Sequence, residues 1–150
     1  DSLRVKVLVP GAASGVLVGG NLSLICSVMG SKYEVRTANS ILFIEDVGES
    51  PYRVDRYLQE LKLAGKFDHI NGLIIGRFSR RKTEEPDKPT DFKMEEVFRQ
   101  YFAKLKVPVI YDFPSGHGSK NISIPFGAKV DINTENQLFK LLEQPVSIDN

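Results

Sequence analysis

The sequence is poor in the residues that build disulfides and metal centres. It contains one cysteine and two histidines in 150 residues. A single cysteine cannot close an intramolecular disulfide or form a Cys-rich zinc site, and it suits a reducing compartment. Because the two histidines also lack the spacing typical of metal ligands, we expect a domain with no metal site and no cofactor.

An excess of charge of one sign and long apolar runs are also lacking. The 20 Lys and Arg residues nearly balance the 19 Asp and Glu residues, which gives no general reason to bind nucleic acid or an acidic surface. The longest apolar runs, residues 41–44 and the interrupted run 22–29, are too short to cross a bilayer. We therefore expect neither nucleic acid nor a membrane as a partner. The chain has no signal peptide and does not begin with Met, so we expect Asp1 to mark a cut or processing boundary in a larger protein.

Hydrophobic periodicity predicts one mixed α/β domain with about six or seven short strands and about three helices. Strands are predicted over residues 3–9, 41–44, 73–75 and 107–110. Residues 128–132 and 138–142 alternate and predict a C-terminal β-hairpin, with a helical turn over 137–143 as the alternative. Helices are predicted after the caps Asn21 and Ser50, with Pro51 in the first turn, and from about Val97 to Leu105.

Two segments read as loops. Residues 10–20 contain four glycines, which let a backbone pass through gaps that a Cβ would forbid, and we expect a glycine-rich loop there. Its spacing matches neither the P-loop nor the dinucleotide-binding fingerprint. Residues 79–91 have no apolar side chain apart from prolines, and we expect a solvated loop.

Two residues are candidates for chemistry. Glu45 directly follows the apolar run 41–44, so its carboxylate either has a partner, has a raised pKa, or simply faces water at the end of the strand. His117 lies between two glycines, which allow a ligand to approach an imidazole closely, although an exposed loop histidine is the simpler alternative. We interpret His69, the other histidine, as structural or superficial.

Glu45 and His117 together suggest an acid–histidine pair, in which the carboxylate orients the ring and stabilises its protonated form. Such a pair needs a nucleophile, and no Gly-x-Ser-x-Gly elbow is present. Ser14 and Ser115 are possible in principle, but neither lies between a strand and a helix in the way an elbow requires. Cys26 falls in an apolar helical stretch, where a buried, unreactive thiol is expected.

Five motifs in this order carry a resemblance to a known family. They are GGNL at 19–22, ILFIED at 41–46, PYRVDR at 51–56, GLIIGRF at 72–78 and GHG at 116–118. Together, from about Val7 to Val146, they resemble the C-terminal domain of the LD-carboxypeptidases, a serine peptidase family that includes murein tetrapeptide carboxypeptidases and microcin-immunity peptidases.

The resemblance implies that residues 1–150 form one swivelling β/β/α domain and that the N-terminal domain with the nucleophilic serine is absent. It places the Glu and His of a Ser-Glu-His triad on Glu45 and His117. The substrate class would be the murein tetrapeptide, whose terminal D-amino acid is released by cleavage of an L,D-peptide bond during cytoplasmic peptidoglycan recycling. The resemblance also implies a homodimer. Without the serine, the isolated chain should be inactive.

Other functions stay open on the sequence. The chain could belong to the immunity branch, which cleaves a peptidyl-nucleotide, or it could be a non-catalytic module that binds a peptide through the glycine-rich segment and Arg77. A regulatory or structural domain is a third reading. Arg77 ends a strand and could bind a substrate carboxylate, although a surface arginine beside Arg80 and Arg81 is the plainer reading. Contact between Glu45 and His117 on one open face would favour the enzyme.

Overall fold

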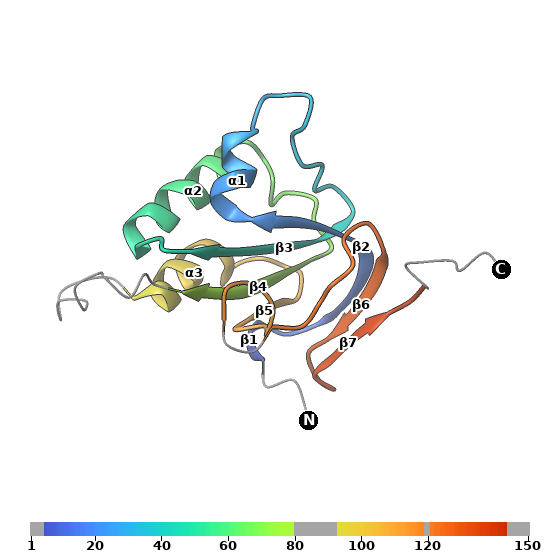
Figure 1. Cartoon of the computed structure of the whole chain (residues 1–150). Coiled ribbons are helices and arrows are strands. Elements are labelled where there is room, and N and C mark those ends of the chain that lie inside the picture. Colours follow the sequence, from blue (N-terminus) through green and yellow to red (C-terminus); the bar gives the residue numbers. More distant parts are fainter. Residues whose placement is uncertain (1–4, 80–92, 119–120, 144–150) are drawn as a thin grey trace.

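The computed structural model describes residues 5–79, 93–118 and 121–143, which form seven strands and three helices (Figure 1). In chain order these are β1 (Lys6–Val9), β2 (Ala12–Asn21), α1 (Leu22–Ser27), β3 (Ser40–Val47), α2 (Pro51–Leu63), β4 (Gly72–Ser79), α3 (Met94–Phe102), β5 (Val109–Tyr111), β6 (Lys129–Asn133) and β7 (Leu138–Leu141). The mixed α/β class and the C-terminal hairpin β6–β7 are confirmed, and the helical alternative for residues 137–143 is wrong.

All seven strands form one sheet, in the order β1-β5-β4-β3-β2-β6-β7. The strands β2, β3, β4 and β5 are parallel, while β1, β6 and β7 pair antiparallel with their neighbours. Strand β2 serves two parts of this sheet: residues 12–16 pair with β6 and residues 16–21 pair with β3. Figure 1 shows how β2 bends between them, so that the sheet curls.

The glycine-rich segment is therefore mostly strand, and the predicted loop is wrong. A Cβ on Gly19 would lie 1.9 Å from the carbonyl oxygen of Phe43, and Gly19 has a φ of 122°. The glycine is needed because β2 and β3 approach closely in a backbone conformation that other residues rarely adopt. The high glycine content of β2 therefore reflects close packing against β3.

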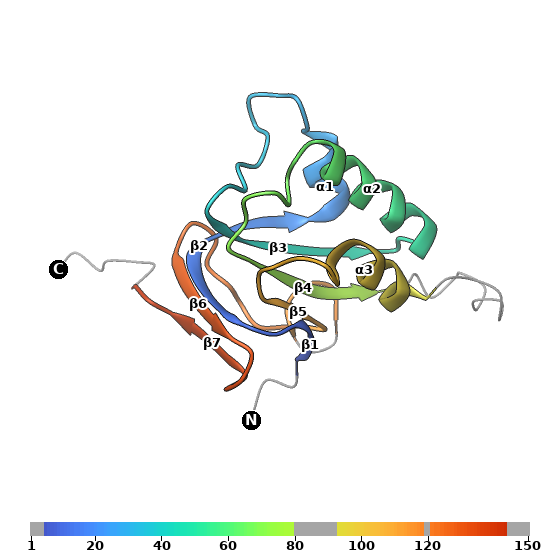
Figure 2. The ribbon, with the colours of Figure 1, turned by 180° about the vertical axis from the view of Figure 1, so that it is seen from behind.

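The helices and the curled sheet make a β/β/α arrangement with a core on each face of the central strands. Figure 2 shows the three helices on one face. There, buried side chains of the helices pack on those of β3, β4 and β5, such as Leu42, Ile44 and Ile75. On the other face, Phe43 and Ile74 pack against residues of β2 and β6. Because β3 is buried on both faces, its continuous apolar run matches the prediction.

The helix boundaries follow local capping. Asn21 caps α1 as predicted, since its side chain accepts a hydrogen bond from the backbone N–H of Leu24. Pro51 begins α2, but Ser50 makes no side-chain capping bond. Helix α3 begins at Met94, earlier than predicted, because its polar first turn is fixed by the Glu96 side chain, which accepts a hydrogen bond from the backbone N–H of Lys93. No helix in the three described stretches is long and apolar enough to span a bilayer. The predicted loop 79–91 lies outside the described residues, apart from Ser79 at the end of β4.

Candidate active site

The candidate site lies at the carboxyl ends of β2, β3 and β4, where open parallel sheets usually bind ligands. Asn21 of β2 and Glu45 of β3 are register partners at this edge. In the next strand, Ile44 pairs with Ile75 and Asp46 pairs with Phe78, so Glu45 faces two residues of β4 rather than one. This is a β-bulge, and bulges next to functional sites redirect side chains.

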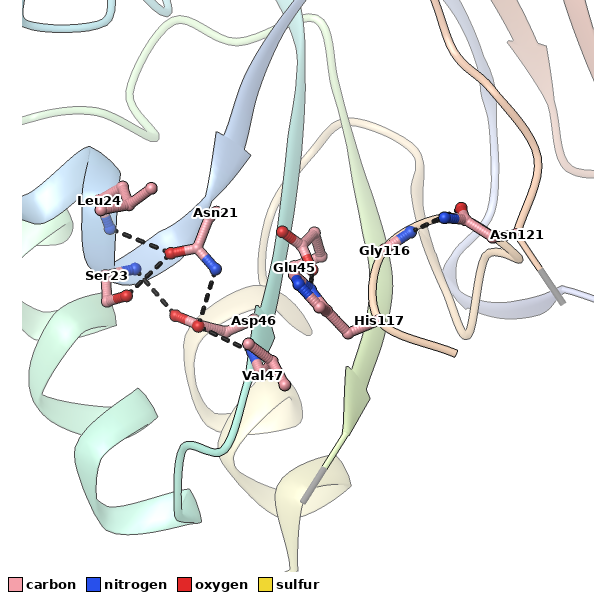
Figure 3. A network of polar contacts seen from close by, with 9 residues as sticks. All are labelled: Asn21, Ser23, Leu24, Glu45, Asp46, Val47, Gly116, His117 and Asn121. Atoms are coloured by element: carbon pink, nitrogen blue, oxygen red, sulfur yellow. Dashed lines mark hydrogen bonds and ion pairs between the residues drawn. The ribbon is translucent and has the colours of Figure 1, made fainter. Parts of the chain in front are cut away.

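Glu45 and His117 contact each other at this edge (Figure 3). Nδ1 of His117 lies 2.5 Å from Oε2 of Glu45. The carboxylate side chain is 9% exposed and the imidazole 48% exposed, so a buried acid holds a ring that opens to solvent. The water-facing alternative for Glu45 is wrong.

Glycines bring the histidine loop down onto the carboxylate. Gly116 has a φ of 111°, and a Cβ there would lie 2.9 Å from Oε2 of Glu45. A Cβ on Gly76 would lie 2.6 Å from the carbonyl oxygen of Ser115. The backbone N–H of Arg77 donates to that same carbonyl at 3.0 Å, which ties the loop to β4. The flanking glycines therefore matter for packing against Glu45 as much as for access to the ring.

The contact defines what the ring can do. A carboxylate only accepts hydrogen bonds, so the neutral imidazole must carry its proton on Nδ1 and keep a lone pair on Nε2. An imidazole held in this tautomer by a carboxylate can take a proton at Nε2 and is stabilised once charged. The arrangement can therefore take up a proton at Nε2 while the carboxylate orients the ring.

A second polar network, which sequence analysis missed, lies beside this pair (Figure 3). The buried carboxylate of Asp46 accepts hydrogen bonds from Nδ2 of Asn21, from the backbone N–H of Ser23 and from its own neighbour Val47, each at 2.8 Å. It therefore fastens the end of β2 and the start of α1 to β3. The signal was a second acid inside a buried apolar strand.

The other candidates from the sequence do not join the pair. No hydrogen bond among the described residues links a serine hydroxyl or the Cys26 thiol to His117; Ser14 lies on β2 in the part that pairs with β6, and Ser115 is buried. The Cys26 thiol is buried, as predicted, and burial raises its pKa to about 12. His69 is exposed.

Two hollows flank the pair. One, of about 490 Å³, is lined by His117 and Arg77 together with residues of β1, β5 and α3. The other, of about 440 Å³, is lined by Asn21, Glu45 and Phe126, among others. Within the described stretches no three His, Cys, Asp or Glu side chains gather in a way that could hold a metal ion.

Comparison with known proteins adds a family to this geometry. Residues 14–132 match the family described as the LD-carboxypeptidase C-terminal domain. The probable murein peptide carboxypeptidase of Bacillus subtilis is 40% identical over 127 residues, which cover 85% of this chain and 39% of that protein.

Solved structures of related proteins have the same fold as this chain. The microcin C7 self-immunity protein MccF, known from Escherichia coli, superposes with a TM-score of 0.82 at 26% identity, covering 96% of this chain and 42% of MccF. The muramoyltetrapeptide carboxypeptidase of Oxalobacter formigenes superposes with a TM-score of 0.75 at 26% identity, covering 91% of this chain and 46% of that one. The chain thus spans about two fifths of the length of the relatives it matches.

Proposed function

The chain belongs to the LD-carboxypeptidase family, as its C-terminal domain, and from this premise we propose that it supplies the base of a serine peptidase. His117 would act as the general base and Glu45 as the acid that orients it. The observation that carries the proposal is the 2.5 Å contact between a buried carboxylate and a half-exposed imidazole.

In the proposed reaction a serine from another domain attacks the carbonyl carbon of the scissile peptide bond. Nε2 of His117 takes the serine proton as the new C–O bond forms. The charged imidazole then gives that proton to the leaving nitrogen as the C–N bond breaks, which releases the C-terminal amino acid. Water repeats the cycle on the acyl-enzyme, and Glu45 holds the ring throughout.

The proposed substrate is a murein tetrapeptide that loses its terminal D-amino acid. The family description and the names of the Bacillus and Oxalobacter relatives support this class of substrate. Cytoplasmic peptidoglycan recycling, a partner domain that carries the serine, and a homodimer belong to the same proposal.

The MccF likeness supports an alternative, the cleavage of a peptidyl-nucleotide. The backbone superposes well on MccF, with a TM-score of 0.82, but the identity is 26% against 40% for the Bacillus murein peptide carboxypeptidase. We therefore place the murein peptide first. A purely binding module would leave the Glu45–His117 contact without a role.

A chimera tests the proposal. The chain replaces the matched domain of the Bacillus subtilis relative, and release of D-alanine from murein tetrapeptide is followed. We expect turnover by the chimera, and kcat about 10⁴–10⁶-fold lower with Glu45→Gln or His117→Ala. The isolated 150-residue chain should release no D-alanine, because a triad without its nucleophile loses orders of magnitude in rate.

Arg53→Gln is the matched control, since Arg53 is an exposed residue of α2 paired with Glu49. It should leave kcat unchanged. Full turnover by a folded His117→Ala chimera would refute the proposal, and faster cleavage of an aminoacyl sulfamoyl nucleoside than of murein tetrapeptide would favour the MccF-like alternative.

A further inference from the structure

The hollow beside His117 contains Arg77, whose buried Nε has no hydrogen-bond partner within the described residues. We propose that this hollow binds the amino acid that leaves the active site, with the Arg77 guanidinium receiving its α-carboxylate. This inference rests on the proposed function, because it assigns a side of His117 to the leaving group. It concerns the 490 Å³ hollow lined by His117, Arg77, Lys6 and Asp112.

The chemistry of the leaving group fixes where such a site must be. In a peptide that loses its C-terminal residue, the α-carboxylate is attached to the same carbon as the leaving nitrogen, so its oxygens lie only about 3 Å from that nitrogen. The leaving nitrogen must receive its proton from His117. A cation that binds this carboxylate therefore has to lie close to His117, and Arg77 lines the same hollow as His117.

The backbone builds Arg77 into this place. Arg77 lies in the β-bulge opposite Glu45, and its backbone forms an isolated bridge with Gly116. Its side chain runs against Gly118, the residue after His117. A Cβ on Gly118 would lie 2.4 Å from Cδ and 3.2 Å from Nη1 of Arg77. The Arg77 side chain thus packs closely against Gly118, the residue that follows His117.

The Nε–H group of Arg77 has only a long ion pair within the described residues. Nε of Arg77 is buried and has no hydrogen-bond partner within the described residues. The nearest carboxylate oxygen described, Oδ1 of Asp112, lies 3.7 Å from Nε, which is beyond hydrogen-bond distance. A buried donor without an acceptor is costly, and a planar fork of N–H groups suits a carboxylate that binds two of them at once.

The other charges of the hollow suit a free amino acid. Lys6 adds a second cation and lies over the Tyr111 ring, 5.3 Å from its centroid. Asp112 and Glu95 add carboxylates to the lining of the hollow, and Glu95 is already paired with Arg99 at 2.9 Å. A released amino acid carries one charge of each sign, so Arg77 can take its carboxylate while Asp112 faces its ammonium group.

Binding of the product to the isolated chain tests the inference without any turnover. The ¹⁵N-labelled chain is titrated with D-alanine and, separately, with D-alaninamide, which keeps the amine but lacks the carboxylate. We expect D-alanine to shift the Nε–H signal of Arg77 and the amide of Gly118, with an affinity about tenfold or more above that of D-alaninamide. Arg77→Gln should abolish this preference, and Arg53→Gln should retain it.

Gly118→Ala is a second, steric variant. It keeps every charge but drives a methyl group into Cδ of Arg77, and it should weaken D-alanine binding while the spectrum stays that of a folded domain. Equal shifts from the acid and the amide, a carboxylate preference that survives Arg77→Gln, or no shifts near Arg77 up to the solubility of D-alanine would each overturn the inference. The binding experiment does not involve the turnover of the chimera, which tests Glu45 and His117. The failure of this inference can therefore be distinguished from the failure of the proposed function.

Discussion

Replacing Asp46 with alanine should destabilise the domain strongly although Asp46 is outside the proposed catalytic pair. The side chain is 2% exposed and accepts three hydrogen bonds, each 2.8 Å long, from Asn21, Ser23 and Val47. Alanine removes both acceptor oxygens and leaves three donors without a partner in partly buried positions. We expect the loosening to centre on the start of α1 and the end of β2.

The size of the effect follows from the number of orphaned donors. A fully buried donor left unpaired costs about 1–3 kcal/mol. The three donors here are only partly buried, so about 1 kcal/mol each is appropriate, which gives about 3 kcal/mol in total. That is a large part of the roughly 5–15 kcal/mol that stabilises a typical domain. With a urea m-value of about 2 kcal/mol/M, the midpoint should fall by about 1.5 M.

Urea unfolding followed by circular dichroism measures this change. Asp68→Ala is the matched control, because Asp68 is exposed and should change stability by no more than about 0.5 kcal/mol. Asp46→Asn keeps one acceptor oxygen and should fall between the two. If Asp46→Ala and Asp68→Ala unfold at the same urea concentration, the network does not hold α1 to the sheet and the reasoning fails.

Two further predictions concern the histidine loop and the thiol. Gly116→Ala should lower the free energy of unfolding by about 2–4 kcal/mol and disturb the His117–Glu45 contact, because it forces alanine into a φ of 111° and against the Glu45 carboxylate. Gly118→Ala meets only a flexible side chain and should lower the free energy of unfolding by less than about 1 kcal/mol. Equal urea midpoints for the two variants would contradict this prediction. Burial raises the pKa of Cys26 to about 12 from an ordinary 9.0, so the thiolate fraction at pH 8 falls about a thousandfold. Iodoacetamide should therefore label the folded chain about a thousandfold more slowly than the urea-unfolded chain. Equally fast labelling of the two states would mean that the thiol is accessible.

The sequence was informative where one local cause decides the structure. The continuous apolar run at residues 41–44 predicts a strand buried on both faces, and β3 is one. Asn21 predicts a helix cap through the short reach of its side chain to nearby N–H groups, and it makes that bond to Leu24. The position of Glu45 directly after the buried run was enough to suggest a partner for its carboxylate.

Long-range packing decides what the sequence could not predict. The glycines of β2 are needed because Phe43, distant in sequence, comes too close for a Cβ, and a glycine-rich strand cannot be told from a loop without that neighbour. The direction of the Arg77 side chain depends on the β-bulge, which arises only when β4 pairs with β3. The three bonds of Asp46 likewise require β2 and α1 to be in place first.

The protonation state of the His117 ring tests the central claim most directly, since the account requires Glu45 to fix a proton on Nδ1 and leave Nε2 as a base. Long-range ¹H–¹⁵N NMR of the ring, at a pH where the imidazole is neutral, distinguishes the two nitrogens. We expect a protonated Nδ1 and an unprotonated Nε2 in the native chain, and a mixture of both tautomers in Glu45→Gln. A proton on Nε2 in the native chain, or a ring unaffected by Glu45→Gln, would contradict the account.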